Sequence, residues 1–244
     1  MKLRHVAALA LVGCCVWPRF GIALERGLHS TYTRDSSDWW SLLRLEPLGN
    51  EPAEGKEAEG PNVSPPAPNN FVVAGVNLWR GIPISEANDQ IASAPVISRG
   101  DAASGRAQIC FQSAEDSGSY KLIFEEGEVA RDAYLIEDGA PWKGIDNCIP
   151  TEQVSTNAAT ESGLHLGMSV AEVKAILGKP SSENKQRIVY ASLWQHPLTA
   201  EELRAFRKSG GPADVSASDR TTYIEIRFRS GKAEYIALSA TETY

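Results

Sequence analysis

The sequence has few of the residues that usually carry catalysis or hold metals. Its 244 residues include four cysteines and four histidines, and they form no Cys-x-x-Cys or His-x-x-x-His pair, which argues against a zinc site. The sequence also lacks a glycine-rich phosphate loop and a Gly-x-Ser-x-Gly elbow. We therefore expect a protein that is not an enzyme and that holds no metal and no cofactor.

Positive charge is also scarce. The chain has 24 Lys and Arg against 31 Asp and Glu, a formal net charge of -7, whereas a nucleic-acid binder normally carries a basic patch. The basic cluster Arg204, Arg207 and Lys208 lies at the end of a predicted helix, where the helix dipole favours cations. We expect no nucleic-acid partner.

A long hydrophobic run occurs only at the N-terminus. Val6–Trp17 is apolar, follows the cations Lys2 and Arg4, and is too short to span a bilayer. This pattern is typical of a secretory signal, which we assign to residues 1–23. The protein is therefore expected outside the cytoplasm, in the periplasm, at the outer membrane or secreted.

Two processing routes fit this leader. Leu11-Val-Gly-Cys14 is similar to a lipobox, in which Cys14 becomes an acylated N-terminus, and a lipid anchor is the only membrane attachment that we expect. The alternative is cleavage after Ala23, in the small-residue site Gly21-Ile-Ala23. We favour cleavage after Ala23, because it leaves an even number of cysteines, Cys110 and Cys148.

Residues 24–70 divide into a tryptophan-bearing segment and a linker. Residues 35–45 can form a short amphipathic helix that contains Trp39 and Trp40. Residues 46–70 contain six prolines, several glutamates and no aromatic residue, which predicts an extended linker. The two tryptophans can anchor in a partner's groove or at a membrane interface, or they can cover the protein's own core.

The chain from Phe71 onward shows an internal similarity. Residues 81–91 align with residues 167–177, and the predicted hairpin at 120–127 aligns with the one at 224–231. Each copy follows the order helix, strand, strand, strand. We therefore predict an α+β fold of two tandem units, 71–150 and 163–244, each an antiparallel three- to four-stranded sheet packed against helix.

The second unit has the clearest local signals. Ser169 and Glu172 form a capping box for a helix ending near Gly178, and Thr199 and Glu202 form another for an inserted helix. Polar and apolar residues alternate from 222 to 229, as expected for a strand with one wet face. We therefore expect each sheet to have one helix-covered side and one side open to solvent or a partner.

The second unit resembles a known family. The motifs are Gly167-Met-Ser169, Glu172-Val173, Leu177-Gly-Lys-Pro180, Tyr190 and Phe228-Arg-Ser-Gly-Lys232. They resemble the SmpA/OmlA (BamE-like) domain of outer-membrane lipoproteins, and two such units in tandem resemble the arrangement in β-lactamase inhibitor proteins. The first unit departs from the pattern, since Pro83 stands where the second has its Ser169 cap.

The resemblance implies a non-enzymatic binding, assembly or scaffold protein of the bacterial cell envelope, with envelope proteins as partners. A second hypothesis is a secreted protein inhibitor of an enzyme. The most distant alternative is a hydrolase that uses Cys110, paired with His165 or His196, or a pair of carboxylates.

The two cysteines of the first unit have a simpler interpretation. In an oxidising compartment, Cys110 and Cys148 are expected to form a disulfide. Closing a loop of this size contributes about 3–4 kcal/mol to stability in the chain-entropy model.

The two processing routes differ in the mass of the mature protein. We expect intact-mass spectrometry of the protein purified from its producing cells to show a chain that begins at Leu24. A chain that begins at Cys14 and carries the added mass of acyl groups would contradict this.

Overall fold

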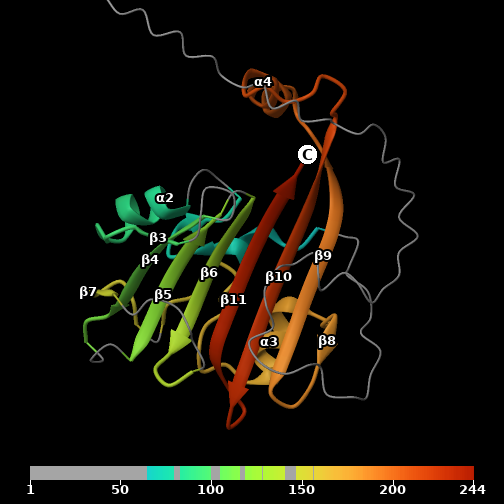
Figure 1. Cartoon of the computed structure of the whole chain (residues 1–244). Helices are drawn as coiled ribbons and strands as arrows, with labels where there is room; N and C mark the ends of the chain where they lie inside the picture. The colour runs from blue at the N-terminus through green and yellow to red at the C-terminus, as the bar shows by residue number, and fades with distance from the viewer. Residues whose placement is uncertain are drawn as a thin grey trace, which may run out of the picture. The chain divides into compact units, whose positions relative to one another are not determined.

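The computed structural model describes residues 65–79, 83–99, 105–115, 119–127, 129–140, 147–155 and 157–244, and Figure 1 shows the whole chain. They belong to one compact unit of the chain, Ser36–Tyr244. The predicted leader, Cys14, Trp39 and Trp40 lie outside the described residues. No helix among the described residues is long and apolar enough to cross a membrane.

The fold combines helices with a large antiparallel sheet, which confirms the prediction of mixed helix and antiparallel strands. The nine-stranded sheet has the order β3-β4-β5-β6-β11-β10-β9-β8, and β7 pairs in parallel with β4. Its strands are β3 (Ile97–Arg99), β4 (Arg106–Ser113), β5 (Tyr120–Glu126), β6 (Ala130–Glu137), β7 (Ile149–Thr151), β8 (Ser182–Glu183), β9 (Arg187–Pro197), β10 (Ala217–Arg229) and β11 (Lys232–Thr243).

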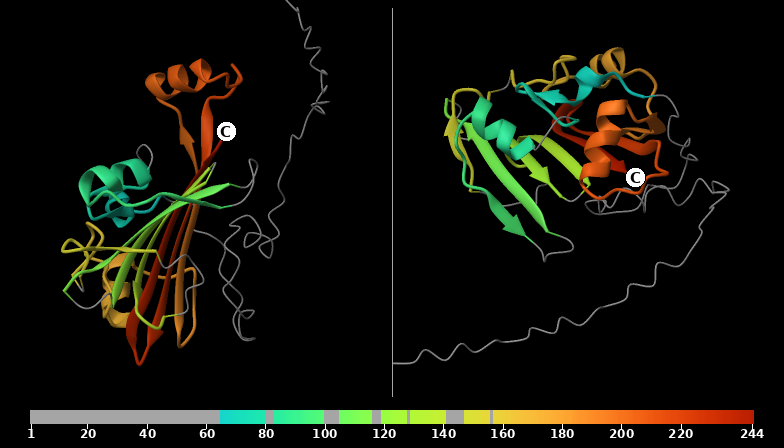
Figure 2. Two further views of the ribbon diagram at one scale, coloured as in Figure 1. Left: turned by 60° about the vertical axis from the view of Figure 1, so that its left-hand side comes forward. Right: turned by 90° about the horizontal axis from the view of Figure 1, so that it is seen from above.

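Helices α2 (Pro83–Gln90) and α3 (Val170–Leu177) lie on one side of this sheet, as Figure 2 shows. The same side also carries the short helix η1 (Pro68–Phe71) and the hairpin of β1 (Val72–Val73) and β2 (Val76–Asn77). Between these elements and the sheet lies the main core. Its largest fully buried side chains include Phe71, Phe111, Phe124, Leu135, Leu164, Ile226 and Ile236.

The sheet joins the two predicted units along one seam. Strand β6, from the first unit, pairs antiparallel with β11, from the second, and Leu135 lies opposite Ile236. The structure therefore has one continuous sheet where the sequence predicts two, and it does not confirm separate units. Pairing gives the backbone groups of both strands hydrogen-bond partners, which an exposed sheet edge lacks.

The register at the seam is nearly symmetric. Tyr134 lies opposite Ala237, and Ile136 lies opposite Tyr235. If Leu135 and Ile236 are equivalent positions of the two regions, then Tyr134 is equivalent to Tyr235, and Ile136 to Ala237. Each residue therefore pairs with the equivalent of the residue that its own counterpart pairs with, as across a twofold axis. The strand order on one side of the seam, β6-β5-β4-β3, matches β11-β10-β9-β8 on the other, and a helix precedes each set in the chain.

The predicted capping box of α3 is present. The Ser169 amide donates to the Glu172 carboxylate at 2.6 Å, and the Glu172 amide donates to the Ser169 hydroxyl at 3.4 Å. Gly178 follows the helix with a φ of 79°, a value that favours glycine, and its amide donates to the Lys174 carbonyl. The local sequence signals therefore describe this helix correctly.

Helix α4 (Ala200–Lys208) fills the connection between β9 and β10, and Figure 1 shows it at the end of these strands. Thr199 and Glu202 form the predicted capping box. No α4 residue is fully buried, and Phe206 stacks on Tyr244 with ring centroids 4.4 Å apart. The Phe206 ring also occupies the space that a side chain at Gly211 would need.

A buried side chain at the seam predicts a costly core substitution. We expect Leu135→Ala to lower the free energy of unfolding by about 2–5 kcal/mol, because Leu135 is 1% exposed and faces the helix-covered core. Val129→Ala is the matched control at a side chain that is 43% exposed, and it should change stability by less than about 0.5 kcal/mol. Urea unfolding measures both, and equal effects would contradict the burial of Leu135 in the main core.

Candidate functional site

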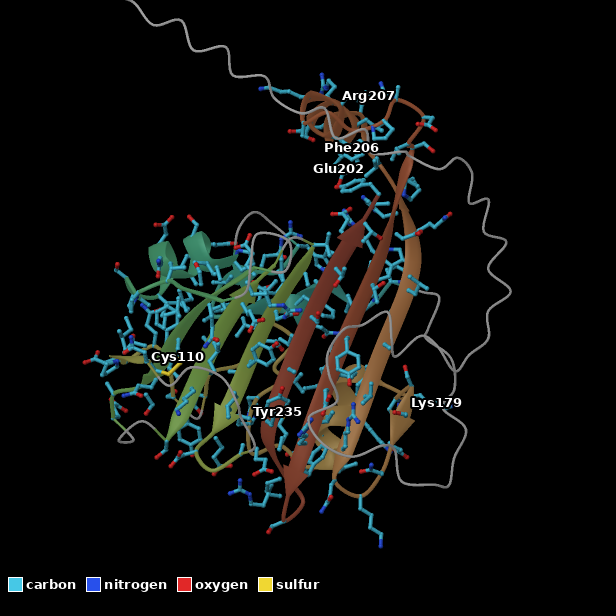
Figure 3. All side chains as sticks on the ribbon, viewed as in Figure 1. Cys110, Lys179, Glu202, Phe206, Arg207 and Tyr235 are labelled. Carbon is cyan, nitrogen blue, oxygen red and sulfur yellow. A yellow bond between two sulfur atoms is a disulfide. The ribbon has the colours of Figure 1, made fainter. Side chains whose placement is uncertain are left out.

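The second side of the sheet carries charged and polar side chains and three tyrosines, and we call it the polar face. Side chains alternate between the two sides of each strand. Along β4–β6 and β9–β11, every second residue therefore lies on the polar face, and the residues between them lie in the main core. Figure 3 shows two of them, Cys110 on β4 and Tyr235 on β11. The residues of the polar face used below are Arg106, Gln108, Cys110, Ile123, Glu125, Asp132, Tyr134, Ile136, Arg187, Val189, Ala191, Tyr223, Glu225, Arg227, Tyr235, Ala237 and Ser239.

One end of the polar face holds two carboxylates that share an arginine. The Arg106 guanidinium donates to Glu125 at 2.6 Å and to Asp132 at 3.2 Å. Asp132 is 2% exposed. Burial raises its pKa to about 6, against the opposing effects of the Ser239 hydroxyl and the Arg106 charge. The carboxyl group of Asp132 therefore titrates well above its ordinary range.

Gln108 continues this row of side chains toward the edge of the sheet. Its Cα pairs with that of Glu125, which in turn pairs with that of Asp132. The Gln108 side chain is buried, yet neither its Nε2 nor its Oε1 has a hydrogen-bond partner among the described residues. A buried amide in this state is costly, so it marks a place where a further polar group is expected.

The other end of the polar face holds a second charged network, centred on Glu225. Arg187 donates to Tyr223 at 2.6 Å and to Glu225 at 3.1 Å, and Tyr223 donates to Glu225 at 2.8 Å. Arg227 donates to the other Glu225 oxygen at 2.6 Å and lies over the Tyr235 ring, 5.1 Å from its centroid. The buried carboxylate is therefore paired with two guanidinium groups.

The tyrosines of this network remain neutral. Burial raises the pKa of Tyr223 above its ordinary value, and the negative charge of Glu225 raises it further. Burial and Glu225 also raise the pKa of Tyr235. Both phenols therefore keep their protons over the physiological pH range, and Tyr223 donates its proton to Glu225.

The middle of the polar face is apolar. Cys110, Ile123, Tyr134, Ile136, Tyr235 and Ala237 form a small hydrophobic cluster. The rings of Tyr134 and Tyr235 lie side by side across the seam with centroids 6.4 Å apart. The polar face therefore has a hydrophobic centre between two charged ends.

The predicted disulfide lies at one side of this cluster. Cys110 is bonded to Cys148, and their Cα atoms are 4.4 Å apart. Cys148 is next to β7, so the bond ties the segment that follows β6 back to β4. The two histidines that a cysteine hydrolase would use contact other groups, since His165 bonds the Leu166 carbonyl and His196 bonds Glu202.

The predicted alternation of β10 is confirmed, but the expectation of an open face is not met at its centre. Ile226 and Phe228 lie in the main core, and Glu225 lies on the polar face. Glu225 is 6% exposed and Tyr235 is 3% exposed. The partly exposed groups are the arginines, with Arg106 at 33%, because long guanidinium side chains keep their ends in water while their stems pack.

Sequence reasoning missed the cluster of Arg106, Glu125 and Asp132. The sequence did contain a signal for it. Arg106 and Gln108 are polar residues two positions apart in β4, a spacing that places both on the same side of the strand. Pairing these strands in the correct register requires the structure. Within the described residues, no group of three or more His, Cys, Asp or Glu side chains could hold a metal ion.

Comparisons with known proteins name no relative. No family model matches the chain, and no curated protein matches it. One solved structure, described as a GntR-family transcriptional regulator, is similar over 63% of this chain and 58% of its own, with 14% identity and a TM-score of 0.22. A similarity at this level carries no argument about fold or function.

The buried carboxyl of Asp132 predicts a pH dependence of stability. Its pKa is raised in the folded state, from about 3.8 to about 6, so its contribution is fully present below pH 4 and is lost as pH rises through 6. We expect the free energy of unfolding of the native protein to fall, relative to that of Asp132→Asn, by at most about 3 kcal/mol between pH 4 and pH 7. Urea unfolding at a series of pH values tests this, and parallel curves for the two proteins would contradict it.

Proposed function

We propose that this protein is a non-enzymatic binding module of the cell envelope and that the polar face is its docking surface for a partner protein. The observation that carries this proposal is the composition of a broad sheet face over which no described helix lies. Three tyrosines and three arginines occupy it. Tyrosine and arginine are enriched at protein interfaces and among the residues that dominate binding energy.

The arginines of the polar face are already oriented. Arg106, Arg187 and Arg227 are each held by a carboxylate at 2.6–3.2 Å, and their side chains are between 16% and 33% exposed. A group that is fixed before binding loses less conformational entropy when a partner arrives. The remaining N–H groups of Arg106 and Arg227 can donate to a partner.

The envelope location is part of the proposal. It is supported by the leader-like N-terminus and by the Cys110–Cys148 bond, since disulfides persist mainly in oxidising compartments. We also propose that the two halves of the sheet are related SmpA/OmlA-like units. The matching strand order and the symmetric register at the seam support this relation.

Site-specific photo-crosslinking in the producing cells tests the docking surface. Gln112 on β4 and Gln195 on β9 also lie on the polar face, because they are two and four residues from Cys110 and Ala191 along their strands. A photoreactive residue at either position should give one discrete adduct with an envelope protein. The matched controls at Ala171 and Ala175 lie on the exposed side of α3 and should give none. Adducts from α3 alone, or from no position, would contradict the proposal.

A quantitative measurement follows once the adduct is identified by mass spectrometry. The purified partner should bind Arg106→Ala at least about tenfold more weakly than it binds the native protein, since Arg106 is the most exposed of the three arginines, while Ala171→Ser should bind unchanged. If the partner is an enzyme whose activity falls on binding, the protein is an inhibitor and not a scaffold.

A further inference from the structure

The outer edge of strand β9 is unpaired over much of its length. On the side away from β10, strand β8 pairs with residues 188–189. The Ser181 hydroxyl then accepts from the amide of Ala191 at 3.0 Å and donates to its carbonyl at 3.3 Å. Among the described residues, no strand or backbone group pairs with this side of β9 from 192 to 197. We call residues 192–197 the free edge, and Figure 1 shows β8 beside one end of β9 only.

Two residues of the free edge direct their backbone groups outward. β9 and β10 pair in one regular register from Arg187 to Pro197, and the backbone groups of an antiparallel strand point to alternate sides along the chain. Because the amide and carbonyl of Ala191 point away from β10, those of Leu193 and Gln195 also do. The free edge therefore presents two donors and two acceptors with the spacing of an antiparallel ladder.

The free edge lacks the features by which proteins usually block an exposed strand. The outer strands β3, β7 and β8 are short, with three, three and two residues. The free edge is longer, contains no Asp, Glu, Lys or Arg, and has its one proline, Pro197, at the last position. Such an edge pairs readily with an extended strand of another chain.

A second copy of the chain fits the free edge because the pattern of groups is self-complementary. When two free edges run antiparallel about a twofold axis at Trp194, Leu193 of each copy lies opposite Gln195 of the other. Each of these pairs exchanges two hydrogen bonds, so every outward group of both residues has a partner. Trp194 then lies opposite its own copy in a non-hydrogen-bonded pair, where side chains approach most closely and aromatic pairs are favourable.

The Trp194 ring is held in place for this contact. It is partly exposed and lies on the helix-covered side, where it meets the Trp79 ring edge to face with centroids 5.7 Å apart. The Arg220 guanidinium lies over the Trp79 ring, 5.2 Å from its centroid. A side chain that is fixed before association loses less conformational entropy when a second copy arrives.

We propose that the protein forms a weak symmetric dimer in which the free edges of two copies pair antiparallel. The same kind of pairing joins β6 to β11 within the chain, and twofold dimers are the commonest symmetric assemblies. The contact is small, which places it among transient interfaces. The two sheets become continuous, so the polar faces of both copies lie on the same side. This dimer does not rest on the proposed function.

Sedimentation velocity of the mature full chain between roughly 1 and 300 µM tests the dimer. We expect the sedimentation coefficient to rise across this range from the value of a monomer to that of a dimer, since a small transient interface dissociates on dilution. A monomer at every concentration would overturn the proposal.

Two substitutions in the free edge distinguish it from any other surface. Leu193→Pro removes an outward amide without breaking the pairing with β10, and Gln195→Lys places on the edge a residue that blocks strand pairing. Each should weaken dimerisation at least about tenfold. Ala171→Lys, the matched control, makes the same change of charge at an exposed position of α3 and should leave dimerisation unchanged. If the proline variant does not fold, Gln195→Lys carries the test.

A dimer that the free-edge substitutions leave intact would overturn the proposal, because another surface would then join the copies. Equal weakening by Gln195→Lys and Ala171→Lys would also overturn it, because net charge alone would explain the effect. The dimer and the proposed function fail separately. A dimer without any crosslinked envelope protein rejects only the function, and a crosslinked envelope protein on a chain that remains monomeric rejects only the dimer.

Discussion

The pairing of β6 with β11 is the contact on which the rest of the structure depends. Without it, both strands would present unpaired backbone groups at an exposed edge. With it, the strands of two sequence regions become one sheet with one core on its helix-covered side. The same pairing brings Tyr134 beside Tyr235 and Asp132 beside Ser239. The polar face is therefore a product of the seam and belongs to neither half alone.

The two sides of the sheet are stabilised in different ways. The helix-covered side follows the usual rule, in which apolar side chains are removed from water. The polar face instead buries Asp132 and Glu225 and compensates each with arginine. A buried ion pair contributes little net stability, because desolvation offsets the attraction. Its geometry, however, holds the arginines and tyrosines in fixed positions, which suits a surface that recognises another group.

Several features could be predicted from the sequence because their signals are local. The capping boxes of α3 and α4 depend on residues three apart, and the apolar side of β10 follows from alternation within one strand. The Cys110–Cys148 bond follows from the cysteine count once export is assumed. The continuous sheet could not be predicted, because Leu135 and Ile236 meet through backbone hydrogen bonds, and any residue except proline supplies these.

The sequence by itself determined the capping boxes that begin α3 and α4, the apolar side of β10, and how few cysteines and histidines the chain contains. Only the tertiary structure decided which strand edges pair, and with them the burial of Asp132 and Glu225 and the pairing of each with arginine. The physical reason is distance along the chain. Periodicity and capping act within one element, whereas the surroundings of a buried charge are set by strands that are far apart in sequence.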